Sequence, residues 1–300
     1  MDRAAVTTLD SRVTTPVGSL AASREPRPSP PTTLIEVAGP SRPTKRVLLP
    51  RWLRKLYGPV ALLLLWWSTS ATGLLDPDLF PPPGAVVGAT TDLIADGELF
   101  LHVWASIQRV LYGLLFGVLG GTVLAVLSGL TRIGEDLLDS TMQILKAVPN
   151  YALTPLLIMW MGIGEEPKIL LIALGVGIAI YINTYSAIRG VDNALVEAAT
   201  TLGASRAALI WHVILPGSLP GFLVGLRLAL SGAWLSLIFA ETINTTEGIG
   251  YLMTRAQNLL QSEVSVLILV IYAVIGMISY AFVRFLERRL LAWRPGFQGT

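Results

Sequence analysis

The stretch VLYGLLFGVLGGTVLAVLSGLT, residues 110–131, decides the fold class because it places 22 uncharged residues in a row. About 20 residues of α-helix are enough to cross the ~30 Å hydrocarbon core of a bilayer. The composition agrees, since 53% of the 300 residues are hydrophobic and 14% are charged, against about 25% charged residues in soluble proteins. The sequence therefore predicts an all-α membrane protein.

Five further stretches extend this prediction to a polytopic protein with six transmembrane helices. Four are uncharged runs of 18 to 20 residues, and the other is a 24-residue stretch that contains Arg227 and follows Pro216. At 1.5 Å per residue, that stretch gives about 36 Å of helix, which crosses a bilayer with some tilt. The five stretches are residues 56–75, 147–164, 169–188, 217–240 and 264–283.

The charges between these stretches predict that both termini lie in the cytoplasm. Residues 1–57 hold 10 Lys and Arg against 4 Asp and Glu, whereas the connection 76–104 holds five acidic residues and no Lys or Arg. Basic residues concentrate in the cytoplasmic connections of membrane proteins. Nucleic-acid binding is not expected, because the basic arm lacks interleaved aromatic residues and precedes membrane helices.

Residues 1–50 form a Pro- and Arg-rich stretch that we expect to be a disordered cytoplasmic extension. Such a composition buries too little apolar surface to offset the entropy of ordering the chain. The extension is either a regulatory arm or a dispensable addition, and the second is favoured. The transmembrane domain is then expected over residues 51–295.

Three glycines spaced by four residues, Gly113, Gly117 and Gly121, form a ladder on one face of the first quoted stretch. Small residues at this spacing let two helices approach closely in lipid, where packing drives association. The ladder predicts a close helix contact. Fixed packing is favoured over a contact that shifts during a conformational change.

The longest connection between predicted cytoplasmic ends reads RGVDNALVEAATTLGASRAALIWHVILPGSLPG, residues 189–221. It predicts two short helices, the first capped by Asp192 or Asn193 and ended by Gly203, the second capped by Ser205 and stopped by Pro216. Helices this short are marginal in water, so this hairpin is expected to dock on a protein or on the membrane surface.

Seven residues in this hairpin fit the pattern E-A-A-x3-G-x9-I-x-L-P, with Val213 in place of Ile. The hairpin thereby resembles the EAA motif of ABC importer permeases and implies the type I permease fold. The resemblance implies that residues 190–216 are a coupling helix hairpin that inserts into a cleft of a cytoplasmic ATPase. The implied coupling residues are Glu197, Ala198, Ala199, Gly203, Ala204, Val213, Leu215 and Pro216.

Four more motifs resemble the sulfonate/nitrate/taurine branch of these permeases, most closely the aliphatic sulfonate permeases. They are LFPPPGAV at 79–86, MQILKAVPNYALTPLLIMWMGIG at 142–164, YINTYSAIRGVD at 181–192 and FAETINTTEGIGYLM at 239–253. The implied function is import of a small anion across the bacterial cytoplasmic (inner) membrane. Related permeases for taurine, nitrate, bicarbonate or pyrimidine precursors remain alternatives, as does an ATPase-independent secondary transporter.

The resemblance also implies the partners. They are a cytoplasmic ABC ATPase dimer that binds ATP and Mg, a periplasmic or lipid-anchored substrate-binding protein, a second permease copy in a homodimer, and membrane lipid. The chain itself offers no phosphate-binding loop, because none of its four lysines precedes Ser or Thr. Without cysteines and with two distant histidines, His102 and His212, it is expected to hold no metal and to catalyse no reaction.

The residues that meet the substrate are less well determined by the sequence. Arg227 either attracts an anion in the pathway or pairs with a carboxylate, and the second is favoured because a lone charge is costly in a bilayer. Glu241 is either a pathway residue or a boundary residue, and Asn150, Tyr151 and Trp160 either line the pathway or pack. His212 is expected at the surface of the coupling hairpin.

Overall fold

The computed structural model describes residues 51–73 and 76–293, so the predicted disorder of residues 1–50 lies outside the described residues. The chain divides at Arg54, and the body treated below is the unit from Lys55 onward. Within the described residues every regular element is helical. The principal helices are α1 (Arg51–Ala71), α2 (Pro83–Ala95), α3 (Glu98–Leu130), α4 (Arg132–Gly134), α5 (Ser140–Ala147), α6 (Thr154–Met161), α7 (Glu166–Arg189), α8 (Asn193–Thr201), α9 (Arg206–Leu209), α10 (Leu215–Glu241), α11 (Ile249–Asn258) and α12 (Ser262–Leu290).

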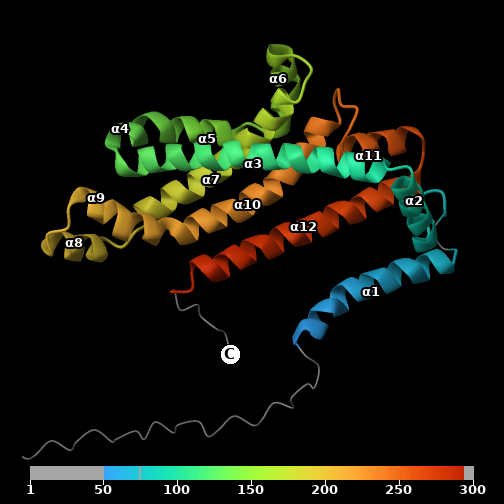
Figure 1. The fold of residues 1–300 in the computed structure, drawn as a ribbon, viewed down its shortest axis with the longest axis horizontal. Helices are drawn as coiled ribbons and strands as arrows, with labels where there is room; N and C mark the ends of the chain where they lie inside the picture. Colours follow the sequence, from blue (N-terminus) through green and yellow to red (C-terminus); the bar gives the residue numbers. More distant parts are fainter. Residues whose placement is uncertain (1–50, 74–75, 294–300) are drawn as a thin grey trace, which may run out of the picture. The chain divides into compact units, whose positions relative to one another are not determined.

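The central element of the body is α7, which packs between α3 and α10 (Figure 1). Its side chains Ile172, Val176 and Ile180 are completely buried. They share one apolar core with Val110 of α3 and with a stripe on α10. The α10 members of this core are Ala229, Ala233 and Leu237.

The glycine ladder of α3 faces α7 directly. A Cβ atom added at Gly113 would lie 2.4 Å from Ile172 Cγ2, and one added at Gly117 would lie 2.6 Å from Val176 Cβ. At Gly121 the added atom would lie 2.5 Å from a backbone carbonyl of α7. The neighbouring Gly120 points away, with nothing within 4 Å. The close approach of α3 to α7 therefore requires the absence of side chains at three of these four glycines.

A second set of glycines brings α10 against the opposite side of α7. A Cβ at Gly221 would lie 2.2 Å from Ala187 Cβ, and one at Gly225 would lie 3.0 Å from Asn183 Cβ. Together with Gly217, these glycines repeat the four-residue spacing of the α3 ladder, so the same rule predicts this second contact although only the ladder on α3 was named above. Both neighbours of α7 thus approach it through glycine.

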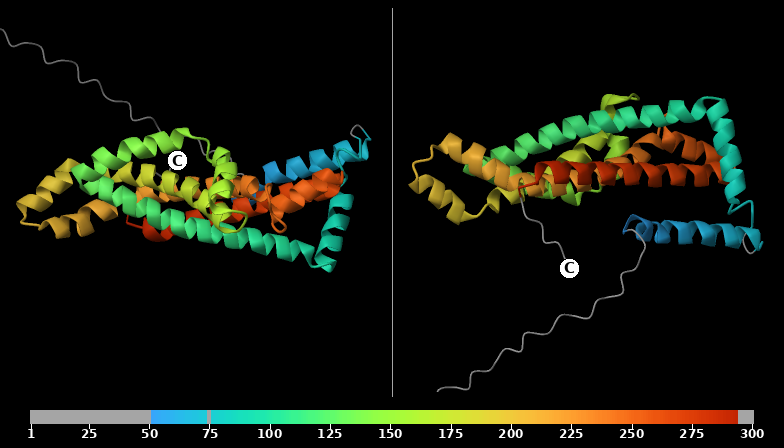
Figure 2. Two further views of the ribbon diagram at one scale, coloured as in Figure 1. Left: turned by 90° about the horizontal axis from the view of Figure 1, so that it is seen from above. Right: turned by 60° about the horizontal axis from the view of Figure 1, so that its bottom comes forward.

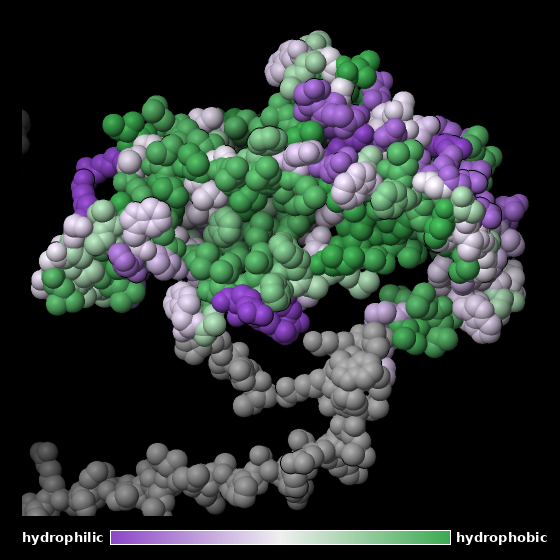
Figure 3. Space-filling model, in the orientation of Figure 1, coloured by the Kyte–Doolittle hydropathy of each residue, from purple (hydrophilic) through white to green (hydrophobic). Residues whose placement is uncertain are grey.

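The outward faces of the long helices are apolar and exposed. On α3 these residues include Leu115, Phe116 and Leu119, and on α12 they include Met277 and Ile278. Figure 3 shows hydrophobic residues covering most of the visible body, while hydrophilic residues gather near α6 and α11. An exposed apolar surface of this extent is the surface a bilayer covers.

The prediction of six transmembrane helices is confirmed only in part. Four helical stretches are long and apolar enough to cross a membrane, and a bent pair raises the number to five among the described residues. The four are Glu98–Leu130, Glu166–Arg189, Arg206–Glu241 and Ser262–Leu290. The first predicted helix lies mostly in α1, whose apolar part is short because the helix begins with basic residues and ends in STSA.

The transmembrane stretch predicted over residues 147–164 does not form one continuous helix. The segments Arg132–Ala147 and Asn150–Met161 are bent by 91° relative to each other. The break falls at Pro149, which has no N–H to donate and forces Val148 into an extended conformation with ψ 123°. Residues 132–161 therefore form two helical segments that meet at this bend.

We expect Gly117→Ala to destabilise the protein by roughly 1–3 kcal/mol, because its methyl group would overlap Val176 of α7. The matched change Gly120→Ala enters open space and is expected to leave stability unchanged or to raise it by up to ~1 kcal/mol through helix propensity. Melting temperatures of the detergent-solubilised variants measure the difference. Equal melting temperatures would contradict the close α3–α7 contact.

Candidate functional site

The first candidate site is the hairpin at one end of the bundle, formed by α8, α9 and the turn between them (Figures 1 and 2). The Asp192 carboxylate accepts a hydrogen bond from the Ala194 N–H at 2.9 Å and caps α8. Gly203 then adopts φ +83°, a left-handed conformation that ends this helix. The Ser205 hydroxyl caps α9 by accepting from the Ala208 N–H at 3.2 Å.

Pro216 does not stop the second helix of the hairpin, so that prediction is wrong. The helix runs without interruption from Arg206 to Glu241, through a π-helical turn, η3 (Ile210–Ile214). In this turn the Leu215 N–H donates to the Ile210 carbonyl, five residues earlier. The wider turn accommodates a proline ring that would clash in a regular helix. The second helix of the hairpin, α9, is consequently continuous with α10.

The hairpin presents apolar side chains without a covering partner among the described residues. Leu195, Leu202 and Trp211 are exposed, and Leu202 is 88% accessible. Glu197 and Ala198 are exposed in the same helix turn, whereas Ala199 is half-buried. A short helical hairpin with large apolar residues on its outside has the character of a protein-binding surface.

The second candidate site is a polar cluster at the opposite end of α10, and its centre is Arg109 of α3. The Arg109 side chain is only 6% exposed. The Nη1 atom of Arg109 donates to Glu241 Oε1 and to the Glu247 carbonyl, each at 2.7 Å. Its Nη2 atom donates to Glu165 Oε1 at 2.8 Å, and its Nε atom donates to the other oxygen of Glu165. Arg109 therefore joins α10 to the α6–α7 connection.

Glu241 is the fixed carboxylate of this cluster. It is buried and accepts hydrogen bonds from the Ser106 hydroxyl and from the Gly250 N–H, each at 2.8 Å, in addition to Arg109. Gly248 lies so close that a Cβ there would be 2.4 Å from the Glu241 carboxyl carbon. With several donors converging on it, this carboxylate can stay charged in a buried position.

The loop that follows α10 is fastened to α3 by the same cluster. The Gly248 N–H donates to His102 Nδ1 at 3.0 Å, and the Ile249 N–H donates to Ser106 Oγ at 2.8 Å. His102 is thus a buried hydrogen-bond acceptor in the helix core. No group of three metal-ligating side chains is found in the described ranges.

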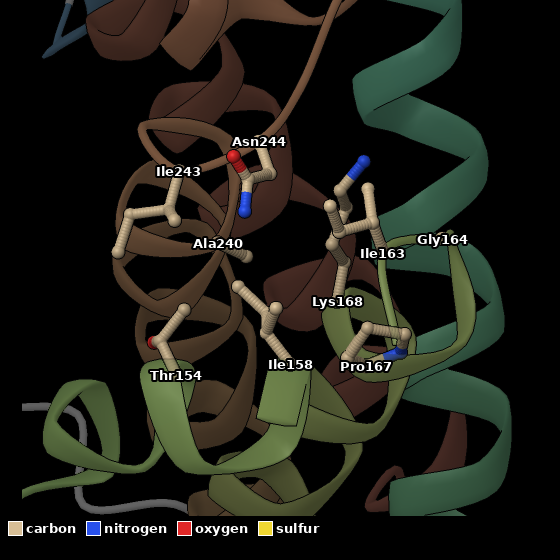
Figure 4. A pocket seen from close by; sticks show the side chains of 9 residues that line it. All are labelled: Thr154, Ile158, Ile163, Gly164, Pro167, Lys168, Ala240, Ile243 and Asn244. Atoms are coloured by element: carbon tan, nitrogen blue, oxygen red, sulfur yellow. The ribbon is translucent and has the colours of Figure 1, made fainter. Parts of the chain in front are cut away.

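Glu165 and Lys168 complete the cluster on the side that faces solvent. Lys168 Nζ donates to Glu165 Oε1 at 2.9 Å, and the Lys168 side chain is 9% exposed while that of Glu165 is 53% exposed. The hydrogen bond from Arg109, with that from Lys168, lowers the pKa of Glu165 to about 2. Glu165 is therefore ionised at any physiological pH. Lys168 also borders a small recess between α6, α7 and the end of α10 (Figure 4).

The five residues considered above for the pathway have separate partners in the structure. Asn150 Nδ2 donates to Ser236 Oγ at 2.8 Å and packs between helices, whereas Trp160 is exposed at the tip of α6. Arg227 pairs with Glu287 of α12, and Glu241 lies in the polar cluster. Tyr151 stacks on Phe239 with ring centroids 4.9 Å apart. His212 is exposed and contacts the Ala208 carbonyl at 3.0 Å.

Arg109, Ser106, Glu165 and Lys168 are absent from the predicted site residues. The helix predicted from the sequence begins at residue 110 and so leaves Arg109 just outside it. In the structure α3 begins at Glu98, which places Arg109 well inside the helix. The two ion pairs of Arg109 also join residues that are 56 and 132 positions apart, which no local pattern reveals.

These features define a multi-pass helical membrane protein with an exposed helical hairpin at one end and a buried ionic cluster at the other. Residues 117–292 match the family model of the binding-protein-dependent transport system inner membrane component. The chain belongs to this family, the permease subunits of ABC importers. Such permeases are non-catalytic, and ATP binding generally resides in a partner ATPase, with a binding protein as the further partner.

Named relatives cover most of the chain. SsuC of Escherichia coli strain K12, named for aliphatic sulfonate transport, is 44% identical over 250 residues, which span 82% of this chain and 95% of that protein. SsuC of Bacillus subtilis strain 168 is 40% identical, spanning 83% and 90% respectively. The taurine permease TauC of E. coli strain K12 is 34% identical, spanning 80% and 90%.

A solved structure shares the fold. The crystal structure of an amino acid ABC transporter matches with a TM-score of 0.54 and 19% sequence identity, over 68% of this chain and 96% of that one. The correspondence covers nearly the whole of that protein. At this level of identity the match shows a shared arrangement of helices only.

We expect Arg109→Met to destabilise the protein by about 3–5 kcal/mol, because Glu241 would be left as a buried charge without its cation. Adding Glu241→Gln to the same chain is expected to restore part of this loss. Thermal unfolding in detergent measures both.

The matched control is Arg255→Met, which removes an exposed ion pair with Glu98 at 3.0 Å and is expected to change stability by no more than about 1 kcal/mol. An equal effect of the two single changes would contradict the structural role assigned to Arg109.

Proposed function

We propose that the chain is the permease subunit of an importer for small aliphatic sulfonates. The two SsuC relatives carry this substrate in their names, and their identity to this chain exceeds that of the taurine permease. A sulfonate is a permanent anion, so it needs cationic groups along its route. Arg109 and Lys168 are such groups at the end of the bundle away from the hairpin.

The proposed assembly has two copies of this chain around a two-fold axis, because four or five long helices are few to enclose a pathway. A cytoplasmic ATPase dimer binds ATP and Mg below them, and a substrate-binding protein delivers the anion on the outer side. In this arrangement the hairpin is cytoplasmic. Helix α1 and the bent pair complete six crossings, with both termini in the cytoplasm.

The hairpin is the proposed coupling element, and the observation that carries this proposal is its continuity with α10. Residues 197–216 include the surface that enters the ATPase cleft, where Ala198 and Ala199 permit close approach. The helix Arg206–Glu241 has 36 residues, about 54 Å at 1.5 Å per residue. A displacement of the hairpin by the ATPase is therefore delivered along α10 to Glu241 in the polar cluster.

We expect Gly203→Val to abolish most ATP-driven uptake while leaving membrane insertion intact. Gly203 has φ +83° with nothing within 4 Å of an added Cβ, so the valine strains only the turn that positions α8 against α9. Uptake into proteoliposomes that contain the full complex, together with co-purification of the ATPase, measures the effect.

The control for this experiment is Gly203→Asn, because asparagine tolerates the left-handed conformation better than other residues with a side chain. It is expected to retain most of the uptake. Full uptake by the valine variant, with the ATPase still bound, would contradict the coupling role of the hairpin.

The substrate is tested separately. Proteoliposomes with the wild-type permease, its ATPase and its binding protein are expected to take up labelled ethanesulfonate in an ATP-dependent manner and to prefer it over taurine, nitrate and bicarbonate. Uptake of one of these alternatives without uptake of ethanesulfonate would reject the sulfonate assignment and retain the permease family.

A further inference from the structure

Two buried cations share one half-exposed carboxylate at the edge of the polar cluster. The side chains of Arg109 and Lys168 are 6% and 9% exposed, whereas that of Glu165 is 53% exposed. Arg109 holds Glu165 with two of its nitrogen atoms, and Lys168 holds the same carboxylate at 2.9 Å. Three hydrogen bonds from two cations thus converge on the two oxygens of one carboxylate, which is the geometry of an anion-binding site occupied by a side chain.

The two carboxylates of the cluster differ in how firmly they are held. Glu241 ends α10, is buried and also accepts from Ser106 and the Gly250 N–H. Glu165 lies in the short connection between α6 and α7, and its partners are the two cations alone. The connection contains Gly162, at φ +84°, two residues after Trp160. Glu165 is therefore the member that can leave without uncovering a buried carboxylate.

A recess lies beside the cations and is lined mainly by apolar side chains. Figure 4 shows Lys168 extending past Ile163 and Ala240, with Ile158 and Pro167 below it. The recess holds little more than one water-sized group, so it suits the contact of a methyl group attached to a charged head. A sulfonate with a short aliphatic tail combines these two properties, since its head needs the cations and its tail needs apolar contact.

We propose that Arg109 and Lys168 bind the sulfonate head of the substrate, and that Glu165 occupies this position until the substrate displaces it. This inference rests on the proposed function. Exchange of one monoanion for another keeps the cluster neutral, with two cations facing Glu241 and one further anion. Binding of sulfonate beside an unmoved Glu165 would instead leave an excess negative charge next to apolar surface, which is costly. Arg109 offers the planar pair of donors that suits an oxyanion.

The experiment measures ethanesulfonate binding to the permease–ATPase complex in lipid nanodiscs, without the binding protein, by isothermal titration calorimetry. The variant Glu165→Gln removes the competing carboxylate and is expected to tighten binding by about tenfold or more. The variant Lys168→Met removes a cation and is expected to weaken binding by about tenfold or more. The matched control is Glu98→Gln, because the Glu98 carboxylate pairs with the exposed Arg255 at 3.0 Å. This variant is expected to bind ethanesulfonate with the affinity of the wild type.

Lengthening the probe tests the recess independently. In the Glu165→Gln complex, the first carbon added to methanesulfonate is expected to raise affinity by about fourfold, and further carbons are expected to add nothing, because the recess holds little more than one water-sized group. A series from methanesulfonate to butanesulfonate gives this dependence. Affinity that is independent of chain length would remove the recess from the proposed site.

The outcomes for Glu165→Gln decide the proposal even if Lys168→Met fails to fold. Tighter binding than the wild type supports displacement of Glu165. Unchanged or weaker binding, or no binding in either protein, overturns it. The uptake assay with the full complex stands apart from this result: ATP-dependent uptake of ethanesulfonate with unchanged binding in the variants rejects only the site, whereas absence of ethanesulfonate uptake rejects the proposed function.

Discussion

The close packing of α3 and α10 against α7 is the constraint on which the rest of the structure depends. Inside a bilayer, apolar side chains gain little by leaving lipid for protein, so helices associate through tight contact and polar bonds. Here tight contact is made by Gly117 on one side of α7 and by Gly221 on the other. With α7 held on both sides, the polar groups at the far end of α3 and α10 come within hydrogen-bonding distance.

The same packing also supports α10 along its contact with α7. The helix is continuous with the hairpin through a π-helical turn and is held along its length by α7. A continuous helix supported by a neighbour transmits displacement better than two helices joined at a proline break. The same residue type has the opposite effect elsewhere, because Pro149 directly follows the regular helix α5 rather than a π-helical turn, and the chain bends there by 91°.

Local chemistry explains what the sequence could predict. The apolar runs, the cap residues Asp192 and Ser205, and the left-handed Gly203 each depend on neighbours within a few positions, and the structure contains all of these features. The outcome at Pro216 depends on a π-helical turn that has no sequence rule. The ionic cluster depends on which helix ends meet in space, and its partners Arg109 and Glu241 are 132 positions apart. The sequence shows each of these charged residues, but it does not show which of them form ion pairs.

In the proposed mechanism, the position of the cluster gives its charges a role beyond stability. A buried ion pair is a weak source of stability, because the cost of removing two charges from water offsets much of their attraction. Apolar residues could have joined α3 to α10 at this point with less cost. The ion pairs instead sit where α10 ends, so any movement of α10 changes the distance between Glu241 and Arg109. Because Arg109 also holds Glu165, the hairpin at one end of α10 and the exposed carboxylate at the other are connected through a single guanidinium group.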